Sequence, residues 1–356
     1  MAVVDILVLG ATYGLLPGAK LALAGHKVTL LGRSDEIQAM ANGGLEVRIP
    51  DRRNGSEHVL RVPVAGISTP GHMVLKTPDQ ADPSQHDFLI LAMQEPQYAA
   101  PEVAALLARA GAVARPCLSL MNLPPPPFLR RLGTIREDDL AGVYHSAAAW
   151  DVLNPGQISV ASPDPQAVRL DPAAPGRLQV TLPSNFKAAP FEHAADQALL
   201  QQLAHDMSRL KVAAGDRHAR TGVALIAHRS PFVPLAKWPM LLTGNCRAVR
   251  WDGSRTIAEA VLNERDESAL IYAQVCSLAL ALGAPREHLV SFKDYAKAAA
   301  QLSRPSSLAR ALDAGAAAVE RIDRLVLNLM RRHAMDTTSV EPIVALIDHR
   351  IEQNRG

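Results

Sequence analysis

Residues 3–31 constrain the fold of this chain more than any other stretch. Val3 to Leu9 is an almost unbroken apolar run, as expected for a parallel strand covered on both faces, and it stops at Gly10. Leu15 to Leu23 has apolar residues at helical spacing, and Lys27 to Leu31 supplies a second strand. The segment therefore predicts a right-handed β–α–β unit at the start of an α/β domain.

The turn between the first strand and the helix is rich in glycine. It reads G-A-T-Y-G from Gly10 to Gly14, where a dinucleotide-binding fingerprint would read G-x-G-x-x-G, and Thr12 stands nearest the position of the middle glycine. Backbone amides at a helix N-terminus can hold a phosphate group. We therefore expect Gly10, Thr12, Tyr13 and Gly14 to contact a nucleotide cofactor; the alternative is a glycine-rich turn without a ligand.

Arg33 and Ser34 follow the second predicted strand, in L-L-G-R-S. An NAD-dependent enzyme would usually present an acidic residue here to the ribose 2′-hydroxyl. A guanidinium and a hydroxyl suit a 2′-phosphate instead, because both form charge-assisted hydrogen bonds to it. The pair predicts NADP(H) as the cofactor, and a solvated surface arginine is the alternative.

Polar side chains follow the next two predicted strands. Phe88 to Met93 is an apolar run that ends at Gln94, and the run from Arg115 onward ends at Asn122. Ligands of open α/β sheets bind beyond the carboxyl ends of the strands. We therefore expect Gln94 and Asn122 to meet the cofactor or the substrate.

The rest of the chain changes from mixed to helical character. Gln157 to Ala161 and Arg177 to Leu182 look like added strands that close the sheet, and Asp196 to Leu210 is amphipathic at helical spacing. Four further helices are predicted, at residues 228–248 (interrupted by prolines), 257–282, 308–333 and 340–353. The expected fold class is α/β: a Rossmann-type parallel sheet in residues 1–215, followed by an all-helical domain in residues 216–356.

Composition narrows the class of function. The 356 residues carry a formal net charge of +2, with no basic stripe of the kind that binds nucleic acid. No run reaches the roughly 18 apolar residues of a membrane span, and the N-terminus lacks a signal-peptide pattern. The three cysteines and the scattered histidines have no metal-ligand spacing. We therefore expect a cytoplasmic protein that acts on a small molecule and holds no metal.

Four stretches also occur, in the same order and at similar spacing, in one known family. They are I-L-V-L-G with G-H-K-V-T-L-L-G-R, S-L-M-N, A-K-W-P-M-L-L-T-G-N, and R-P-S-S-L-A-R-A-L-D-A-G. Together they resemble the ketopantoate reductase (2-dehydropantoate 2-reductase) family. The resemblance implies NADPH as cofactor and reduction of a 2-keto acid or related carbonyl by hydride transfer, in a cleft between a Rossmann domain and a helical domain. We expect the helical domain to carry the substrate and homodimer contacts.

The resemblance also implies roles for residues of the helical half. Lys237 matches the family's active-site lysine, which protonates or polarises the keto oxygen, although a second alignment would place Met240 there. Asn245 matches one of the asparagines that hold the substrate. Ser306 and Ser307 fit the substrate-side serines. We expect Lys237, Asn245, Ser307 and the strand-end Asn122 to form the catalytic group.

The chain departs from the family pattern at several positions. Asn122 stands at the asparagine of the family's Q-N-G motif, but Leu123 replaces the glycine, and the family's fourth-strand lysine is replaced around Gln94. The family's glutamate aligns without gaps to Val319, next to Glu320. Three hypotheses therefore remain: a ketopantoate-reductase-like enzyme, an opine- or imine-type dehydrogenase of the same architecture, and a non-catalytic NADP(H)-binding sensor.

Overall fold

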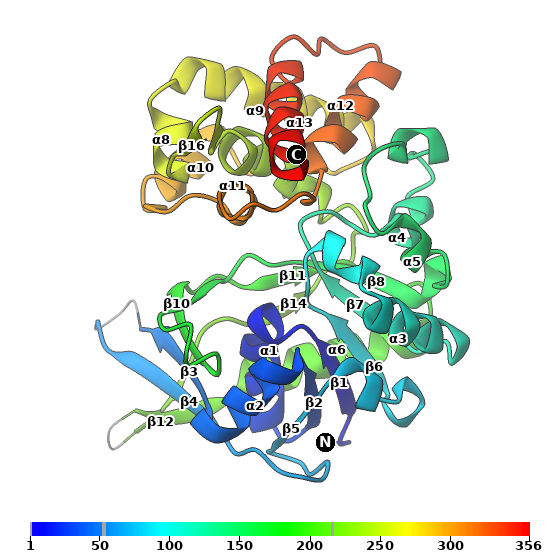
Figure 1. Cartoon of the computed structure of the whole chain (residues 1–356), viewed down its shortest axis with the longest axis vertical. Coiled ribbons are helices and arrows are strands. Elements are labelled where there is room, and N and C mark those ends of the chain that lie inside the picture. The colour runs from blue at the N-terminus through cyan, green and yellow to red at the C-terminus, as the bar shows by residue number, and fades with distance from the viewer. Residues whose placement is uncertain (1, 52–54, 215–216) are drawn as a thin grey trace. The chain divides into compact units, whose positions relative to one another are not determined.

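The computed structural model describes residues 2–51, 55–214 and 217–356 (Figure 1). The chain forms two compact units. Unit 1 comprises Met1–Met93, Gln97–Phe128 and Ala148–Ser230, and unit 2 comprises Gln94–Pro96, Leu129–Ala147 and Pro231–Gly356. The domain boundary expected between residues 215 and 216 lies outside the described residues.

The main sheet of unit 1 confirms the predicted Rossmann-type architecture. Its strands are β1 (Asp5–Leu9), β2 (Lys27–Leu31), β5 (Met73–Lys76), β6 (Phe88–Leu91), β7 (Cys117–Leu120), β8 (Ile158–Ser162), β11 (Phe186–Ala188) and β14 (Leu225–Ala227). They lie in the order β14-β11-β8-β7-β6-β1-β2-β5. Six of these strands, in the spatial order β8-β7-β6-β1-β2-β5, are parallel to one another. They follow the standard Rossmann order, in which the chain moves outward in opposite directions on either side of the boundary between β1 and β6. This boundary is the point at which such sheets bind ligands.

Burial explains why these segments form central strands. Every residue of β6 and β7 is buried, as is every residue of β1 after Asp5. Such strands read as continuous apolar runs because helices cover both faces of a parallel sheet. The helices of unit 1 are α1 (Ala11–Leu23), α2 (Ser34–Gly43), α3 (Pro101–Ala112) and α6 (Ala194–Arg209). Of these, α1 packs against β2 and α6 packs against β14.

A second sheet in unit 1 corrects one expectation. Its strands are β3 (Leu45–Pro50), β4 (Glu57–Val62), β9 (Gln166–Arg169) and β10 (Arg177–Leu182), in the order β4-β3-β10-β9. The sequence predicted that residues 177–182 close the main sheet, and this was wrong: β10 pairs with β3 and β9. Its side chains alternate between exposed and buried, which suits a sheet with only one covered face. A further pair joins β12 (Lys211–Ala214) to β13 (Arg217–Arg220).

The last three predicted helices lie in unit 2, and two of them are divided. The stretch 257–282 forms α8 (Ile257–Leu262) and α9 (Arg265–Ala281), because Glu264 between them leaves helical geometry at φ −124° and ψ 61°. The stretch 308–333 forms α11 (Ser307–Asp313) and α12 (Ile322–Arg332). The remaining elements are α10 (Phe292–Ala299), α13 (Glu341–Arg355) and the strand pair β15 (Val249–Arg250) and β16 (Gly253–Ser254).

Two short helices, α4 (Pro126–Arg131) and α5 (Ala147–Trp150), lie where the chain passes from one unit to the other. Among the described residues, no helix combines the length and the apolar character needed to cross a membrane.

Candidate active site

The glycine turn lies at the switch point of the main sheet. Gly10 follows β1 with φ 102°, a conformation that favours glycine, and its carbonyl accepts a hydrogen bond from the Gly14 amide at 2.9 Å. A Cβ atom at Gly10 would lie 2.4 Å from the carbonyl oxygen of Ala92, just beyond β6. A Cβ atom at Gly14 would lie 2.4 Å from Cγ1 of Val8. Gly10 therefore lets the turn pass close to the end of β6, and Gly14 lets α1 pack against β1.

The N-terminus of α1 is suited to an anion. The first turn, all of it within the described residues, contains no acidic side chain, and its N-cap, Gly10, has no side chain to satisfy the free amides. Thr12 is exposed and Tyr13 is half-buried at this end. Backbone amides and the helix dipole together favour a phosphate here.

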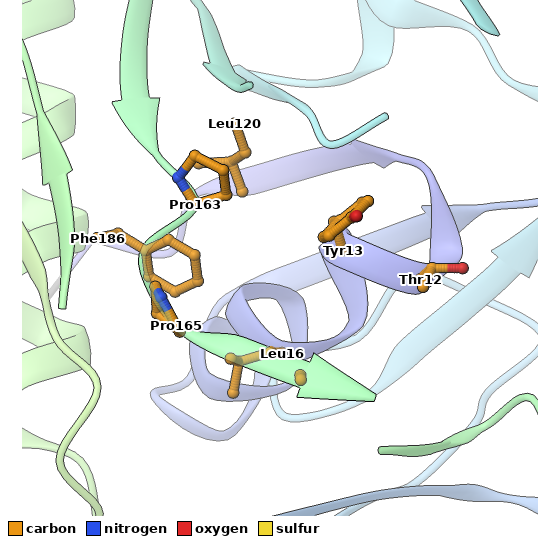
Figure 2. A pocket seen from close by; sticks show the side chains of 8 residues that line it. Thr12, Tyr13, Leu16, Leu120, Pro163, Pro165 and Phe186 are labelled. Atoms are coloured by element: carbon orange, nitrogen blue, oxygen red, sulfur yellow. The ribbon is translucent and has the colours of Figure 1, made fainter. Parts of the chain in front are cut away.

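A small apolar pocket adjoins the glycine turn (Figure 2). It is lined by Thr12, Tyr13, Leu16, Leu120, Pro163, Pro165, Ala167 and Phe186. Tyr13 lies on one side, and Phe186 lies with the two prolines on the other. Of these lining residues, the sequence predicted only Thr12 and Tyr13 as ligand contacts. No local sequence pattern shows that Phe186 and the two prolines lie near the start of α1 in the folded chain. Any ligand group beside the turn would meet an apolar wall.

Arg33 and Ser34 are exposed at the start of α2. The Arg33 guanidinium donates two hydrogen bonds to the Asp35 carboxylate, from Nε and from Nη2, both at 3.2 Å. The hydrogen bond to Asp35 raises the pKa of Arg33, and the negative charges of Asp35 and Glu36 add to the effect. The guanidinium is thus ionised and accessible, but it already has an anionic partner that the sequence analysis did not consider.

The two strand-end residues differ in their surroundings. Asn122 lies beyond β7, and its Oδ1 atom is buried without a hydrogen-bond partner among the described residues. A buried acceptor without a partner is costly, so Oδ1 is a candidate for a ligand hydrogen bond. Gln94 belongs to unit 2, next to Glu95. The Glu95 carboxylate is fully buried and accepts hydrogen bonds from the amides of His145 (3.1 Å) and Ser146 (2.7 Å).

The residues predicted in the helical half lie on two neighbouring segments of unit 2. Lys237 ends a short 3-10 turn, Leu235–Lys237, and is half-buried. The chain continues through α7 (Trp238–Met240) into a π-helical turn, Leu241–Cys246, which contains Asn245. π-helical turns occur frequently at functional sites. The helix predicted for residues 228–248, kinked or broken by its prolines, is broken into these short turns.

A hydrogen bond joins two of the predicted positions. The Ser306 hydroxyl donates to the carbonyl oxygen of Asn245 at 2.7 Å, and it accepts from the Ala309 amide at 3.1 Å as the N-cap of α11. Ser306 is therefore occupied in holding the two segments together. Ser307, the next residue, is half-buried in the first turn of α11 and remains the better candidate for a substrate contact.

The position of the family's glutamate is apolar and closed. Val319 is buried, whereas Glu320 is half-buried and lies close enough to Tyr144 to act on it electrostatically. Burial raises the pKa of the Tyr144 hydroxyl well above its usual value, and the charges of Glu95 and Glu320 add to the rise. Tyr144, Glu95 and Glu320 thus share one region of unit 2. The sequence analysis missed Tyr144 and Glu95, because neither belongs to a recognisable motif.

The standard strand order, the glycine turn at the switch point and the helical second unit define a two-unit protein of the Rossmann class. Residues 6–122 match the family model described as "Ketopantoate reductase PanE/ApbA". This match confirms the resemblance found in the sequence over residues 6–122. No curated protein sequence matched the chain.

Solved structures share the fold at low identity. The 2-dehydropantoate 2-reductase from Methylococcus capsulatus superposes with a TM-score of 0.67 at 15% identity, covering 99% of this chain and 98% of that one. D-mandelate dehydrogenase, solved with NADH and anilino(oxo)acetate, gives 0.64 at 14% identity, with coverage of 99% and 100%. The dimeric ketopantoate reductase from Staphylococcus aureus gives 0.61 at 10% identity, with coverage of 98% and 99%. At these identities the similarity shows the fold alone.

The residues of unit 1 fit a dinucleotide. A Cβ atom at Gly10 would fill the space beside the end of β6, the N-cap of α1 has no side-chain hydrogen bond, and Asn122 Oδ1 lacks a partner within the described chain. Among the described residues, no group of three or more His, Cys, Asp or Glu side chains could hold a metal ion.

Proposed function

We propose that this protein is an NADPH-dependent reductase of a 2-keto acid or a related carbonyl compound. The observation that carries the proposal is the turn at Gly10, which passes against the end of β6 at the switch point and opens directly into α1. In sheets of this order a dinucleotide binds at this place. The match to the family model adds the reaction type to the binding site.

On this proposal, unit 1 holds the cofactor. The first amides of α1, with Gly10, Thr12, Tyr13 and Gly14, receive the pyrophosphate, and Arg33 and Ser34 receive the 2′-phosphate. The proposal also assigns the nicotinamide to Asn122, which follows β7, and to Gln94, which follows β6 in the chain but belongs to unit 2. When bound, the reduced nicotinamide supplies the hydride.

Unit 2 acts on the substrate. The Lys237 ammonium donates a proton to the keto oxygen as the carbonyl is reduced. Asn245 and Ser307 hydrogen-bond the substrate's carboxylate or hydroxyl, while Ser306 fixes the backbone of Asn245 relative to α11. Holding the carbonyl in one orientation is the main contribution that such neutral hydrogen-bonding groups make to the rate.

The structural neighbours support a broad substrate class. D-mandelate dehydrogenase is named for a 2-hydroxy acid, the product that reduction of a 2-keto acid would give. That enzyme was solved with NADH, so the choice of NADPH in this chain rests on Arg33 and Ser34 and needs its own measurement. We also propose a homodimer, as described for the Staphylococcus aureus reductase, and sedimentation velocity tests it.

Two experiments test the function. Fluorescence titration of the purified protein should show NADPH binding more tightly than NADH, and absorbance at the nicotinamide band should show NADPH oxidation with ketopantoate or other branched 2-keto acids. Oxidation only after an amine is added would show an opine- or imine-type dehydrogenase. Tight NADPH binding without turnover on the whole panel would leave a nucleotide sensor. Absence of binding by either cofactor would overturn the proposal.

A further inference from the structure

A buried carboxylate lies where β2 ends and α1 begins. A Cβ atom at Gly32, the residue after β2, would lie 2.9 Å from Oε2 of Glu36 and 3.2 Å from Cβ of Ala11. The Glu36 side chain is only 9% exposed. In Rossmann folds the adenosine ribose lies over this corner, and the group presented there decides between a 2′-hydroxyl and a 2′-phosphate. Glu36 therefore occupies a decisive position that the glycine motif does not reveal.

The partner of this carboxylate comes from the second sheet. Arg169, at the end of β9, forms an ion pair with Glu36, and its side chain is 21% exposed. Its Nε atom is buried and has no hydrogen-bond partner in the described part of the chain. The Nη2 atom, which forms the ion pair, also has no hydrogen-bond partner in the described residues, so the guanidinium has unused donors for a phosphate oxygen.

The charges at this corner are balanced. Glu36 also acts on Arg33, whose pKa its negative charge helps to raise, so the carboxylate lies near two guanidinium groups. Arg33 has Asp35 as a second anionic partner. Two positive and two negative side chains thus lie at this corner, and the loss of any one of them leaves a net charge of one unit.

We propose that the Glu36–Arg169 pair, together with Arg33, sets the selectivity of this protein between a 2′-phosphate and a 2′-hydroxyl. This inference rests on the proposed function, because it concerns the same cofactor. Arg169 compensates the buried Glu36 carboxylate and offers its free Nε donor, so a 2′-phosphate is accepted. Without Arg169, the uncompensated carboxylate repels the phosphate and binds the ribose hydroxyls instead.

Binding of nucleotide fragments tests this inference without catalysis. We compare adenosine 2′,5′-bisphosphate with 5′-AMP by isothermal titration calorimetry, since they differ only at the 2′ position. In Arg169→Met, affinity for the bisphosphate should fall about tenfold or more, on the scale of one charge-assisted interaction, while affinity for 5′-AMP changes little. In Glu36→Gln, affinity for the bisphosphate should rise about threefold or more, because an opposing charge is removed.

Arg61→Met is the matched control, because Arg61 lies on β4 of the same sheet and pairs with Glu46 at the surface. An equal loss of bisphosphate affinity in this control would overturn the inference, since the effect would then come from net charge alone. If Arg169→Met does not fold, Glu36→Gln decides the question by itself. Unchanged selectivity in Glu36→Gln, with NADPH still bound by the unaltered protein, overturns the inference and leaves the proposed function intact.

Discussion

Two glycines of α1 provide a direct test of how closely this helix packs against the sheet. Both lie within the helix, and neither has a positive φ, so alanine at either position gains the same helix propensity of about 1 kcal/mol. The added methyl group meets different neighbours. At Gly14 it would lie 2.4 Å from Val8 Cγ1, whereas at Gly18 its nearest neighbour is Met73 Cε, at 3.2 Å.

The neighbours differ in their ability to move. Val8 is fully buried in the central strand β1, and its branched side chain has few alternative rotamers. The terminal methyl of Met73 belongs to a flexible, unbranched side chain. Overpacking of a rigid core costs about 1–3 kcal/mol. We therefore expect Gly14→Ala to be less stable than Gly18→Ala by about 1–3 kcal/mol, because the shared gain in propensity cancels from the difference.

Urea denaturation followed by circular dichroism measures both variants against the parent protein, and equal slopes would confirm that the unfolding transition itself is unchanged. Gly18→Ala should be as stable as the parent or slightly more stable. If Gly14→Ala matched Gly18→Ala in stability, α1 could move away from β1 at little cost, and the argument for close packing at the glycine turn would fail.

Three further predictions concern charged side chains. Arg33→Asp should weaken NADPH binding by about 2 kcal/mol or more, measured by fluorescence titration, and equal affinities of the unaltered protein for NADPH and NADH would contradict the assigned role. Lys237→Met should lower turnover by about two to four orders of magnitude and leave cofactor affinity unchanged. Steady-state kinetics measures the turnover, and the same fluorescence titration measures the affinity. Unchanged turnover would show that another group donates the proton. Burial lowers the pKa of Lys20 to about 7, although its Nζ atom donates to Thr221 Oγ1 at 2.7 Å. Because this value lies below that of the unfolded chain, the unfolded state binds more protons above about pH 7, so the free energy of unfolding should rise with pH from there toward pH 10. Denaturation at several pH values should show this rise in the parent protein and a smaller one in Lys20→Met, and identical pH profiles would refute the assignment.

The sequence was most informative where the pattern was continuous. The apolar runs of β1 and β6 predicted buried parallel strands because both faces of such strands are covered. The second sheet was not predicted, because its strands alternate between buried and exposed side chains and pair with strands far away in the sequence, as β3 does with β10. The break at Glu264 also escaped notice, since the apolar spacing continues from α8 into α9 across a single non-helical residue.

In the candidate site, too, the sequence located residues that belong to a local pattern and missed contacts that only the fold creates. Glycines 10 and 14 could be located from their order after a strand, and the structure supplies a steric reason for each. Asp35 beside Arg33 was visible in the sequence, but its hydrogen bonds were not. Arg169 could not have been found, because only the pairing of β9 with β10 brings it back toward α2. Contacts made by tertiary structure alone leave no local pattern.

The π-helical turn at Leu241–Cys246 bears on how this chain should be compared with its relatives. A π-helical turn holds more residues than an α-helical one, and it commonly behaves as a single-residue insertion into an α-helix. A relative with a regular α-helix here would be one residue shorter, and a gapless alignment would then shift every position after the turn. Alignments that assign Asn245 should therefore place a gap within this turn. Deleting one of the residues 241–244, which precede Asn245 in this turn, should rotate Asn245 by about 100° around the helix axis, the angle per residue of an α-helix.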